Sequence, residues 1–372
     1  MSMQRGLTLF LLAIAPVFAG AEKKPQPVTS AHAGLTTRVF HPSAMRNWRG
    51  SEHKELHVTI WYPAPVTAVE TRQVIGPPDA PIFEAGLASP RAEFEPALRK
   101  LPLIVLSHGT GGTALQLAWL GTVLARAGYI VAAVDHPGNN RTEPYTAEGF
   151  VLWWERATDL SEVIDGMLAD EDLGPRIDRD RIGAAGFAIG GYTVLELAGA
   201  RTDISVLYDH CRTDPAYIMC GHVPEMKGMG TAQDMLAQAR KTSGLSLAAS
   251  SDSYRDPRVH AVFAISPAVA EVLTPESLRA IRVPLAIAVG DSDPIAPAKE
   301  NADYLRSNIH GAREQVLPGG VAHYTFLDTC TALGKEKVGA YCDDKPGVDR
   351  DKVHADVADG AVQFFDWALK VR

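Results

Sequence analysis

Short runs of consecutive apolar residues alternate along the chain with longer segments in which apolar residues recur at helical spacing. Continuous apolar runs bounded by turn residues are typical of parallel strands that are covered on both faces. They occur at 103–107, 129–134, 182–187, 259–265 and 284–289, with an alternating run at 57–62 that Pro63 ends and a short run at 314–317. We expect each of these segments to form a strand.

The segments between these runs have the apolar spacing of helices. We predict helices at 114–127, 155–169, 190–200, 297–307 and 353–369. Strands that alternate with helices predict an α/β fold with a doubly wound, mostly parallel sheet, in which ligands bind beyond the carboxyl ends of the strands. Residues 35–372 are expected to form one such domain, since single α/β domains with insertions reach this length.

Residues 202–256 interrupt this alternation. They contain two cysteines, several glycines and a helix-like piece at 231–240, and they lie between a predicted helix and the next predicted strand. We interpret them as an insertion that forms a cap over the end of the sheet where a ligand would bind.

The N-terminus has the pattern of an export signal. Arg5 precedes an apolar stretch at 7–18, and small residues up to Ala21 offer a cleavage site. We therefore expect residues 1–21 to be a signal peptide and the mature chain to reach the periplasm or the medium. The apolar stretch is shorter than the roughly 20 residues of a membrane span, and no later segment is long and apolar enough to insert stably in a membrane. Residues 22–34 are polar and contain two prolines, which predicts a flexible leader.

Charge and composition narrow the class of partner. The formal net charge is −8 with a pI near 5.8, and no run of lysine or arginine stands out, so neither the whole chain nor a local patch favours nucleic acid. Hydrophobic residues make up 46% of the chain and charged residues 22%, which allows a sizeable core. We expect a small-molecule partner.

The four cysteines form two pairs that are close in sequence. Cys211 lies near Cys220, and Cys330 lies near Cys342. In an oxidising compartment these pairs predict two short-range disulfides. Buried free thiols are the alternative, and a zinc site is disfavoured because neither pair has Cys-x-x-Cys spacing.

A glycine-rich turn connects the predicted strand at 182–187 to the helix that follows it. The turn reads Gly186-Phe187-Ala188-Ile189-Gly190-Gly191. Such a turn lifts its central side chain above the sheet, as the nucleophile elbow of serine hydrolases does. Here the central residue is Ala188, where an elbow carries serine. Plain packing and a phosphate-binding loop are alternatives, although no lysine follows as a phosphate loop requires.

A second loop of small residues, 106–112, overlaps the end of the predicted strand at 103–107. In hydrolases with a nucleophile elbow this loop supplies one amide of the oxyanion hole, and the residue after the nucleophile supplies the other. We assign the two amides to Thr110 and Ile189. His108 lies in the same loop, and we interpret it as part of the loop's structure rather than as a base.

Downstream segments supply an acid and a base in the order that elbow hydrolases follow. Asp291 and Asp293 follow the strand at 284–289, and each is a candidate acid or merely a turn residue beside Pro294. His323 is the only one of 12 histidines that lies in a glycine-rich turn after these acids. We expect it to be the base, a solvated loop side chain being the alternative.

From about Thr59 to Leu369 the chain resembles the predicted dienelactone hydrolases, a bacterial group close to the platelet-activating-factor acetylhydrolase branch of the α/β-hydrolases. The motifs that carry the resemblance recur in order at 106–112, 135–139, 181–193, 290–297 and 319–327. The resemblance implies an α/β-hydrolase fold and the hydrolysis of carboxylic esters by a Ser, Asp and His triad, with no metal or organic cofactor. The family spacing favours Asp293 over Asp291 as the acid.

The chain departs from that family at the nucleophile. Family members carry serine where this chain has Ala188, and a methyl group cannot attack a carbonyl carbon. We therefore expect the chain to bind a carboxylic ester and barely hydrolyse it. Either a serine was replaced in order to trap substrate or a natural relative has lost activity, and the intact motifs around the gap favour the first explanation. A noncatalytic ester-binding or interaction protein on the same scaffold is the alternative function.

Aromatic residues near the predicted strand ends are candidates for the substrate pocket. They are His108, Trp119, His136, Trp153 and Trp154. Such side chains could face an acyl or aryl group, and packing in the core or under the cap is the alternative for each. We assign no metal to Asp135 and His136, because no partner cluster with metal spacing accompanies them.

Overall fold

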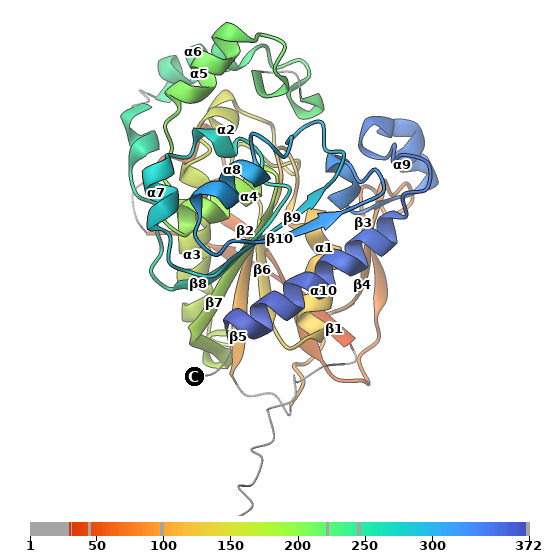
Figure 1. Ribbon diagram of the computed structural model, residues 1–372. Coiled ribbons are helices and arrows are strands. Elements are labelled where there is room, and N and C mark those ends of the chain that lie inside the picture. Colours follow the sequence, from red (N-terminus) through yellow and green to blue (C-terminus); the bar gives the residue numbers. More distant parts are fainter. Residues whose placement is uncertain are drawn as a thin grey trace, which may run out of the picture.

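The structure is a computed structural model that describes residues 30, 32–43, 46–96, 100–220, 223–243 and 247–369. These residues form an 11-stranded sheet with helices on both faces (Figure 1). The strands are β1 (His32–Phe40), β2 (Leu56–Ala64), β3 (Thr71–Ile75), β4 (Phe83–Pro90), β5 (Leu101–Ser107), β6 (Ile130–Val134), β7 (Ile177–Phe187), β8 (Val259–Ile265), β9 (Leu285–Gly290), β10 (Arg313–Leu317) and β11 (Thr329–Cys330). The α-helices of the same ranges are α1 (Ala118–Arg126), α2 (Ala147–Val151), α3 (Glu155–Ala169), α4 (Ile189–Leu197), α5 (Ser205–Thr213), α6 (Ala232–Ser243), α7 (Pro275–Ala280), α8 (Ala302–Asn308), α9 (Ala332–Lys337) and α10 (Arg350–Ala368).

The strand order creates a crevice at the carboxyl ends of β5 and β7. The strands lie in the order β10-β9-β8-β7-β5-β6-β2-β1-β4-β11, and β3 pairs with β4. Neighbours from β10 to β6 are parallel, whereas β2 is antiparallel to both β6 and β1. The chain passes from β5 to β6 on one side and then to β7 on the other side of β5. Loops leave in opposite directions at such a switch point, and ligands bind between them.

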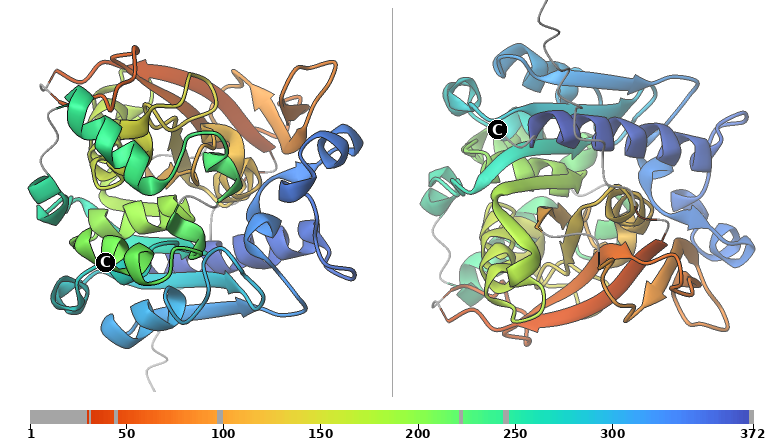
Figure 2. Two further views of the ribbon diagram at one scale, coloured as in Figure 1. Left: turned by 90° about the horizontal axis from the view of Figure 1, so that it is seen from above. Right: turned by 90° about the horizontal axis from the view of Figure 1, so that it is seen from below.

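The centre of the sheet matches the prediction because both of its faces are buried. All residues of β5 are buried, and β8 and α3 have the predicted bounds of 259–265 and 155–169. Helices cover both faces of the sheet (Figure 2). Along β5, Leu103 and Val105 belong to the core that includes residues of α3 and α4, whereas Ile104 and Leu106 belong to the core that includes residues of α1 and α10. The continuous apolar run of this strand therefore serves two cores at once.

Strands β1, β3, β4 and β11 have no counterpart among the predicted elements. β1 begins at His32, so the expectation of a flexible leader over 22–34 is wrong for its last residues. A Cβ at Gly34 would lie 2.3 Å from the Tyr62 ring, so the missing side chain allows β1 to pack closely on β2. The expected signal peptide, 1–21, and the leader up to residue 29 lie outside the described residues.

The helix expected at 297–307 is wrong in its first turn, because α8 begins only at Ala302. The preceding residues form a loop that the Asn301 side chain holds. Its amide donates to the Pro297 carbonyl at 3.0 Å and its oxygen accepts from the Ala270 N–H at 2.9 Å. These bonds replace the first helical hydrogen bonds.

The insertion at 202–256 contains α5, α6 and short 3-10 turns, which lie together at one end of the molecule (top of Figure 1). Its α6 packs against α2. Both expected disulfides are present: Cys211–Cys220 lies in this insertion, and Cys330–Cys342 lies between β11 and α10.

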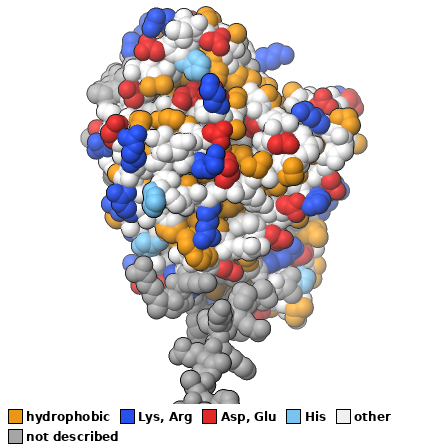
Figure 3. Space-filling view, in the orientation of Figure 1, with side chains coloured by type: hydrophobic (Ala, Val, Ile, Leu, Met, Phe, Trp, Pro, Cys, Tyr) orange, Lys and Arg blue, Asp and Glu red, His pale blue; other side chains and the backbone are white. Residues whose placement is uncertain are grey.

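The surface and the helices bear on the class of partner. On the face shown in Figure 3, acidic and basic side chains are interspersed rather than gathered in a basic patch. Within the described ranges, none of the helices combines the length and the apolar character that crossing a bilayer requires.

Candidate active site

The turn between β7 and α4 holds Ala188 in a strained backbone conformation. Its φ is 54° and its ψ is −118°, which L-residues adopt rarely and at a cost of roughly 1–3 kcal/mol. The turn is tight because two glycines let backbones touch. A Cβ at Gly186 would lie 2.2 Å from the Gly190 carbonyl oxygen, and a Cβ at Gly190 would lie 2.0 Å from that of Ser107. The sequence Gly-x-Ala-x-Gly therefore builds this geometry directly.

His323 and Asp293 form a hydrogen-bonded pair near this turn. The His323 Nδ1–H donates to Asp293 Oδ2 at 2.7 Å, which leaves Nε2 as the acceptor nitrogen of the ring. Burial alone would raise the pKa of Asp293, but the charge and hydrogen bond of His323 hold it below its usual value. The Ser266 hydroxyl and the N–H groups of Ile295 and Ala296, the latter two at 2.8 Å, also donate to this carboxylate. Asp293 is thus held ionised behind the imidazole.

Asp291 has a different place. Its carboxylate is exposed and accepts the N–H groups of Gly319 and Gly320, each at 2.9 Å. These bonds hold the turn that precedes His323 on the end of β9. The geometry therefore joins Asp293, and not Asp291, to the histidine.

A small cavity of about 20 Å³ lies over residue 188. Ala188, His323 and Thr110 border it, together with Met219 and Val223 from the insertion. A larger cavity of about 330 Å³ shares Thr110, Gln116 and Glu225 with the small one. The expected nucleophile position, base and oxyanion loop therefore meet at one cavity.

The loop after β5 is held in place by side chains from three elements. Gln116 Oε1 accepts the Gly109 N–H at 2.7 Å, and Asn139 Oδ1 accepts the Gly111 N–H at 2.8 Å. The buried Arg156 guanidinium donates to the His108 carbonyl and, at 3.2 Å, to Asn139 Oδ1. This network fixes the backbone on both sides of Thr110.

The two amides expected in the oxyanion hole lie at the cavity and at the start of α4. Thr110 borders both cavities, and Ile189 is the first residue of α4, directly after Ala188. In the part of the chain that the structure describes, neither backbone N–H donates a hydrogen bond. Free N–H groups of this kind are suited to an oxyanion. That of Ile189 also lies at the N-terminus of a helix, where the helix dipole favours negative charge.

His136 is wrong as a pocket residue, because it is fully buried behind the oxyanion loop. Its Nδ1–H donates to Asp159 Oδ2 at 2.6 Å, and its Nε2 accepts the Ser107 hydroxyl at 2.8 Å. Burial, and then the Arg156 cation, lower the pKa of His136 to about 3. Arg49 donates to the same Asp159 oxygen at 2.6 Å. Ser107, His136 and Asp159 therefore have the connectivity of a triad, yet none of them borders either of the two cavities at the candidate site.

The other four expected pocket residues also pack away from both cavities. His108 is buried, and its ring bonds the Gly109 carbonyl and the His136 N–H at 2.7 and 3.1 Å. Trp119 stacks on His354 and donates to the Phe326 carbonyl at 3.0 Å. Trp154 is fully buried, and the half-buried Trp153 donates to the Phe150 carbonyl. Strand ends indicate where these residues lie along the sheet but not how deeply each side chain packs.

Glu225 is a cavity residue that sequence reasoning missed. It comes from a 3-10 turn of the insertion and borders both cavities. The Tyr324 hydroxyl donates to its Oε2 at 3.1 Å, and burial raises the pKa of Glu225. No motif marks this residue, because only the folding of the insertion brings it to the site.

Comparisons with known proteins point to esterases. The model of one protein family, described as platelet-activating factor acetylhydrolase, isoform II, matches residues 85–151. The chain is 33% identical over 103 residues to "Cutinase est1" of Thermobifida alba, which covers 27% of this chain and 31% of the cutinase. It is 24% identical over 213 residues to the platelet-activating factor acetylhydrolase of Canis lupus familiaris, which covers 44% of this chain and 46% of that protein. The chain thus spans about a third of the first relative and less than half of the second.

A solved structure covers nearly the whole chain. The ferulic acid esterase from Streptomyces cinnamoneus matches 94% of this chain and 93% of its own, with a TM-score of 0.57 at 20% identity. At this identity the likeness concerns the fold alone. Together with the sheet order, it confirms the α/β-hydrolase fold expected from the sequence.

Proposed function

We propose that this chain is built as an exported carboxylic ester hydrolase of the Ser, Asp, His type in which Ala188 occupies the position of the nucleophile. As it stands, the chain should bind an ester and barely hydrolyse it. The relatives found by sequence are named as cutinases and a platelet-activating factor acetylhydrolase, which supports the ester as the substrate class. Within that class, we place the chain with the predicted dienelactone hydrolases on the motifs of its sequence.

The strained backbone of Ala188 carries this proposal. An alanine that only packs has no need of a φ of 54°, and relaxing it would recover roughly 1–3 kcal/mol. At a site of reaction, the same conformation lifts the side chain out of the sheet toward the base. Ala188 and His323 do border one cavity, and Asp293 holds the His323 ring. The backbone is therefore shaped for a residue that reacts, although the alanine lacks the reacting atom.

With serine at this position, the groups of the site would carry out acyl transfer. The hydroxyl oxygen would attack the ester carbonyl carbon while His323 Nε2 takes its proton. The amides of Thr110 and Ile189 would stabilise the negative oxygen, and Asp293 would stabilise the imidazolium. The alcohol would leave with the proton from His323, and water would release the acid by the same steps. The Ala188 methyl group can start none of these, and the loss of a triad nucleophile costs on the order of a millionfold in kcat.

Two further features support the remaining parts of the proposal. The two disulfides fit an oxidising compartment, as expected for an exported protein. The insertion at 202–256 contributes Met219 and Val223 to the small cavity, which supports its role as a cap.

Restoring the hydroxyl tests the proposal. Ala188→Ser should raise kcat for a p-nitrophenyl ester by several orders of magnitude, up to about a millionfold. Adding His323→Ala should remove that gain, and Ala188→Cys tests whether a thiol also works, as in dienelactone hydrolases proper. If Ala188→Ser folds, binds the ester and still does not hydrolyse it, the noncatalytic ester-binding protein is the better description.

A further inference from the structure

The two cavities at the candidate site differ greatly in size. One water molecule needs on the order of 10–15 Å³ of such space, so the cavity of about 20 Å³ over Ala188 holds little more than one. The neighbouring cavity of about 330 Å³ lies within the range of ligand pockets. Because both border Thr110, a carbonyl bound beside this residue has room for a large substituent in the larger cavity and not in the small one.

The loop closed by Cys330 and Cys342 forms one wall of the larger cavity. It contributes Val338 and Tyr341, and the segment that leads into it contributes Leu327. A second wall comes from the β3–β4 hairpin, with Ile75, Ile82 and Phe83. All six of these side chains are aliphatic or aromatic, so the two walls suit an apolar group.

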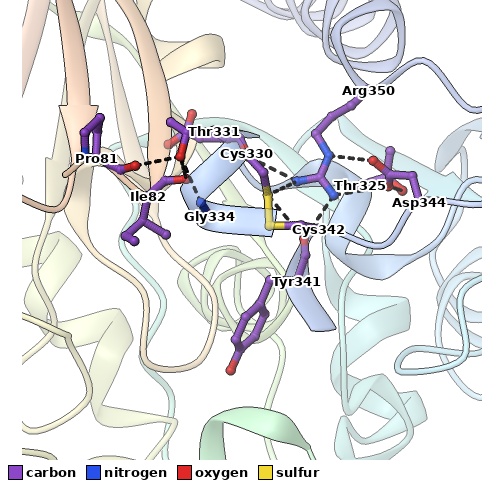
Figure 4. The surroundings of a disulfide bond; sticks show 11 residues. Pro81, Ile82, Thr325, Cys330, Thr331, Gly334, Tyr341, Cys342, Asp344 and Arg350 are labelled. Carbon is purple, nitrogen blue, oxygen red and sulfur yellow. Dashed lines mark hydrogen bonds and ion pairs between the residues drawn. A yellow bond between two sulfur atoms is a disulfide. The ribbon is translucent and has the colours of Figure 1, made fainter. Parts of the chain in front are cut away.

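The disulfide loop is fixed to the hairpin on one side (Figure 4). The Thr331 hydroxyl donates to the Pro81 carbonyl at 2.6 Å, and the Thr331 N–H donates to the Ile82 carbonyl at 3.0 Å. A Cβ at Gly334 would lie 2.1 Å from the same Ile82 oxygen. The two walls are therefore in direct backbone contact at this edge.

Arg350 fixes the loop on its other side (Figure 4). Its guanidinium donates to the Tyr341 carbonyl at 3.0 Å, to the Asp328 carbonyl at 3.1 Å and to the Asp344 carboxylate at 2.9 Å. These bonds and the disulfide hold both ends of the loop. The wall that carries Val338 and Tyr341 is thus formed before any ligand arrives.

We propose that the larger cavity is the subsite for a ring-sized apolar substituent of the ester, such as an aryl group, and that the Cys330–Cys342 disulfide holds its wall. A preformed pocket lined by Phe83 and Tyr341 favours a rigid, flat group over a flexible chain, because a ring loses less freedom on binding. The other substituent of the ester must then be short. This inference rests on the proposed function for the ester, but the subsite itself needs no catalysis.

Binding of 1-naphthol to the chain with Ala188 tests the subsite apart from hydrolysis, because this probe contains the ring and no ester. When the chain is titrated with 1-naphthol, the change in the probe's fluorescence should reach saturation. Val338→Trp fills the cavity and should weaken this binding at least tenfold, whereas Val66→Trp, at a residue that is 71% exposed, should leave it unchanged. Equal effects of the two variants, or tighter binding of 1-octanol than of 1-naphthol, would overturn the proposal.

Removing the disulfide provides a second test. The double variant Cys330→Ser with Cys342→Ser should weaken 1-naphthol binding several-fold, whereas Val66→Ser, at an exposed residue, should not. Unchanged binding in the first variant would refute the role of the disulfide. Hydrolysis by Ala188→Ser is measured separately. If 1-naphthol binds but Ala188→Ser does not hydrolyse esters, the proposed esterase activity is contradicted and the subsite is not. If Ala188→Ser hydrolyses esters but 1-naphthol does not bind, the subsite alone is contradicted.

Discussion

The chain contains two histidine–aspartate pairs with similar geometry and different surroundings. His136 and Asp159 are 2.6 Å apart with the Ser107 hydroxyl on the far ring nitrogen, and His323 and Asp293 are 2.7 Å apart near the Ala188 methyl group. The first set is complete but fully buried, and it borders neither of the two cavities at the candidate site. The second lacks its hydroxyl but borders a cavity.

Charge and backbone separate the two sets further. Burial and Arg156 lower the pKa of His136 to about 3, which makes it a poor base, and Ser107 lies in the regular strand β5. Ala188 instead occupies a strained turn at the start of a helix. The comparison teaches that a Ser, His and Asp connection is not by itself a catalytic site. Access to a cavity and a strained backbone at the nucleophile position distinguish the set that can react.

The largest change in activity is expected from replacing Asp293, and replacing Asp291 should have a much smaller effect. In an Ala188→Ser background, Asp293→Asn should lower kcat on the order of 10⁴-fold, because an amide no longer holds the required tautomer and charge of the imidazole. Asp291→Asn is the matched control and should lower kcat less than about tenfold, since this residue only holds a turn. Ester hydrolysis kinetics measure both. A larger loss from Asp291→Asn would exchange the two roles.

In the buried set, the aspartate should matter for stability. Asp159→Asn removes the fully buried carboxylate that Arg49 and Arg46 share. Of the carboxylates in the described ranges, Arg46 then keeps only Glu162 and Arg49 only Glu155, at 3.9 Å, so the free energy of unfolding should fall by roughly 3–5 kcal/mol. Asp165→Asn on the same helix removes an exposed pair with Arg258 and should cost less than about 1 kcal/mol. Urea unfolding compares the two variants. Similar losses would mean that the Asp159 network is not the structural element described here.

Asn139 lies between the two sets, and replacing it should have an intermediate effect on kcat. Asn139→Ala removes the acceptor of the Gly111 N–H and a partner of Arg156, so the amide of Thr110 should lose its fixed position. In the Ala188→Ser background, kcat should fall roughly 10- to 100-fold with a smaller change in KM. Asn308→Ala, in α8 and away from both cavities, is the control. A change in KM alone would show that the loop binds substrate without stabilising the transition state.

The smallest effect concerns pH. Because the folded pKa of His136 is lowered to about 3 and an unfolded histidine titrates near 6.5, protons bind the unfolded chain more readily between these values. Lowering the pH from about 6.5 to about 5.5 should therefore cost stability, by up to about 1.4 kcal/mol for this group, which is less than the loss expected from Asp159→Asn. Nitrogen NMR of the His136 ring should show a neutral imidazole from pH 8 down to pH 5. Protonation of His136 near pH 6.5 would contradict the assigned environment.

Sequence patterns predicted the centre of the fold better than its edges. Strands β5 and β8 are covered on both faces, so their apolar runs are unmistakable, whereas β1 and β4 contain glycine and exposed residues and pair at the edge. Loops were also harder to predict. The Asn301 side chain bonds the Pro297 carbonyl, so α8 begins later than the apolar pattern predicts.

In the candidate site, positions along the chain were easier to predict than side-chain depth. Strand ends placed Ala188, Asp293 and His323 near one another, because parallel strands end at one edge of the sheet. His136 also follows a strand end, but its side chain is buried against Asp159 instead of bordering the pocket. Glu225 was missed, because its place depends on how the insertion folds back over the cavity.

Covalent labelling shows directly whether residue 188 or Ser107 holds the reactive position. Diisopropyl fluorophosphate phosphorylates a serine only where a base and an oxyanion hole activate it. Intact-mass analysis and peptide mapping should show one phosphoryl group at position 188 in the Ala188→Ser chain and none in the chain with Ala188. A label on Ser107, or an Ala188→Ser chain that stays unlabelled, would contradict the account.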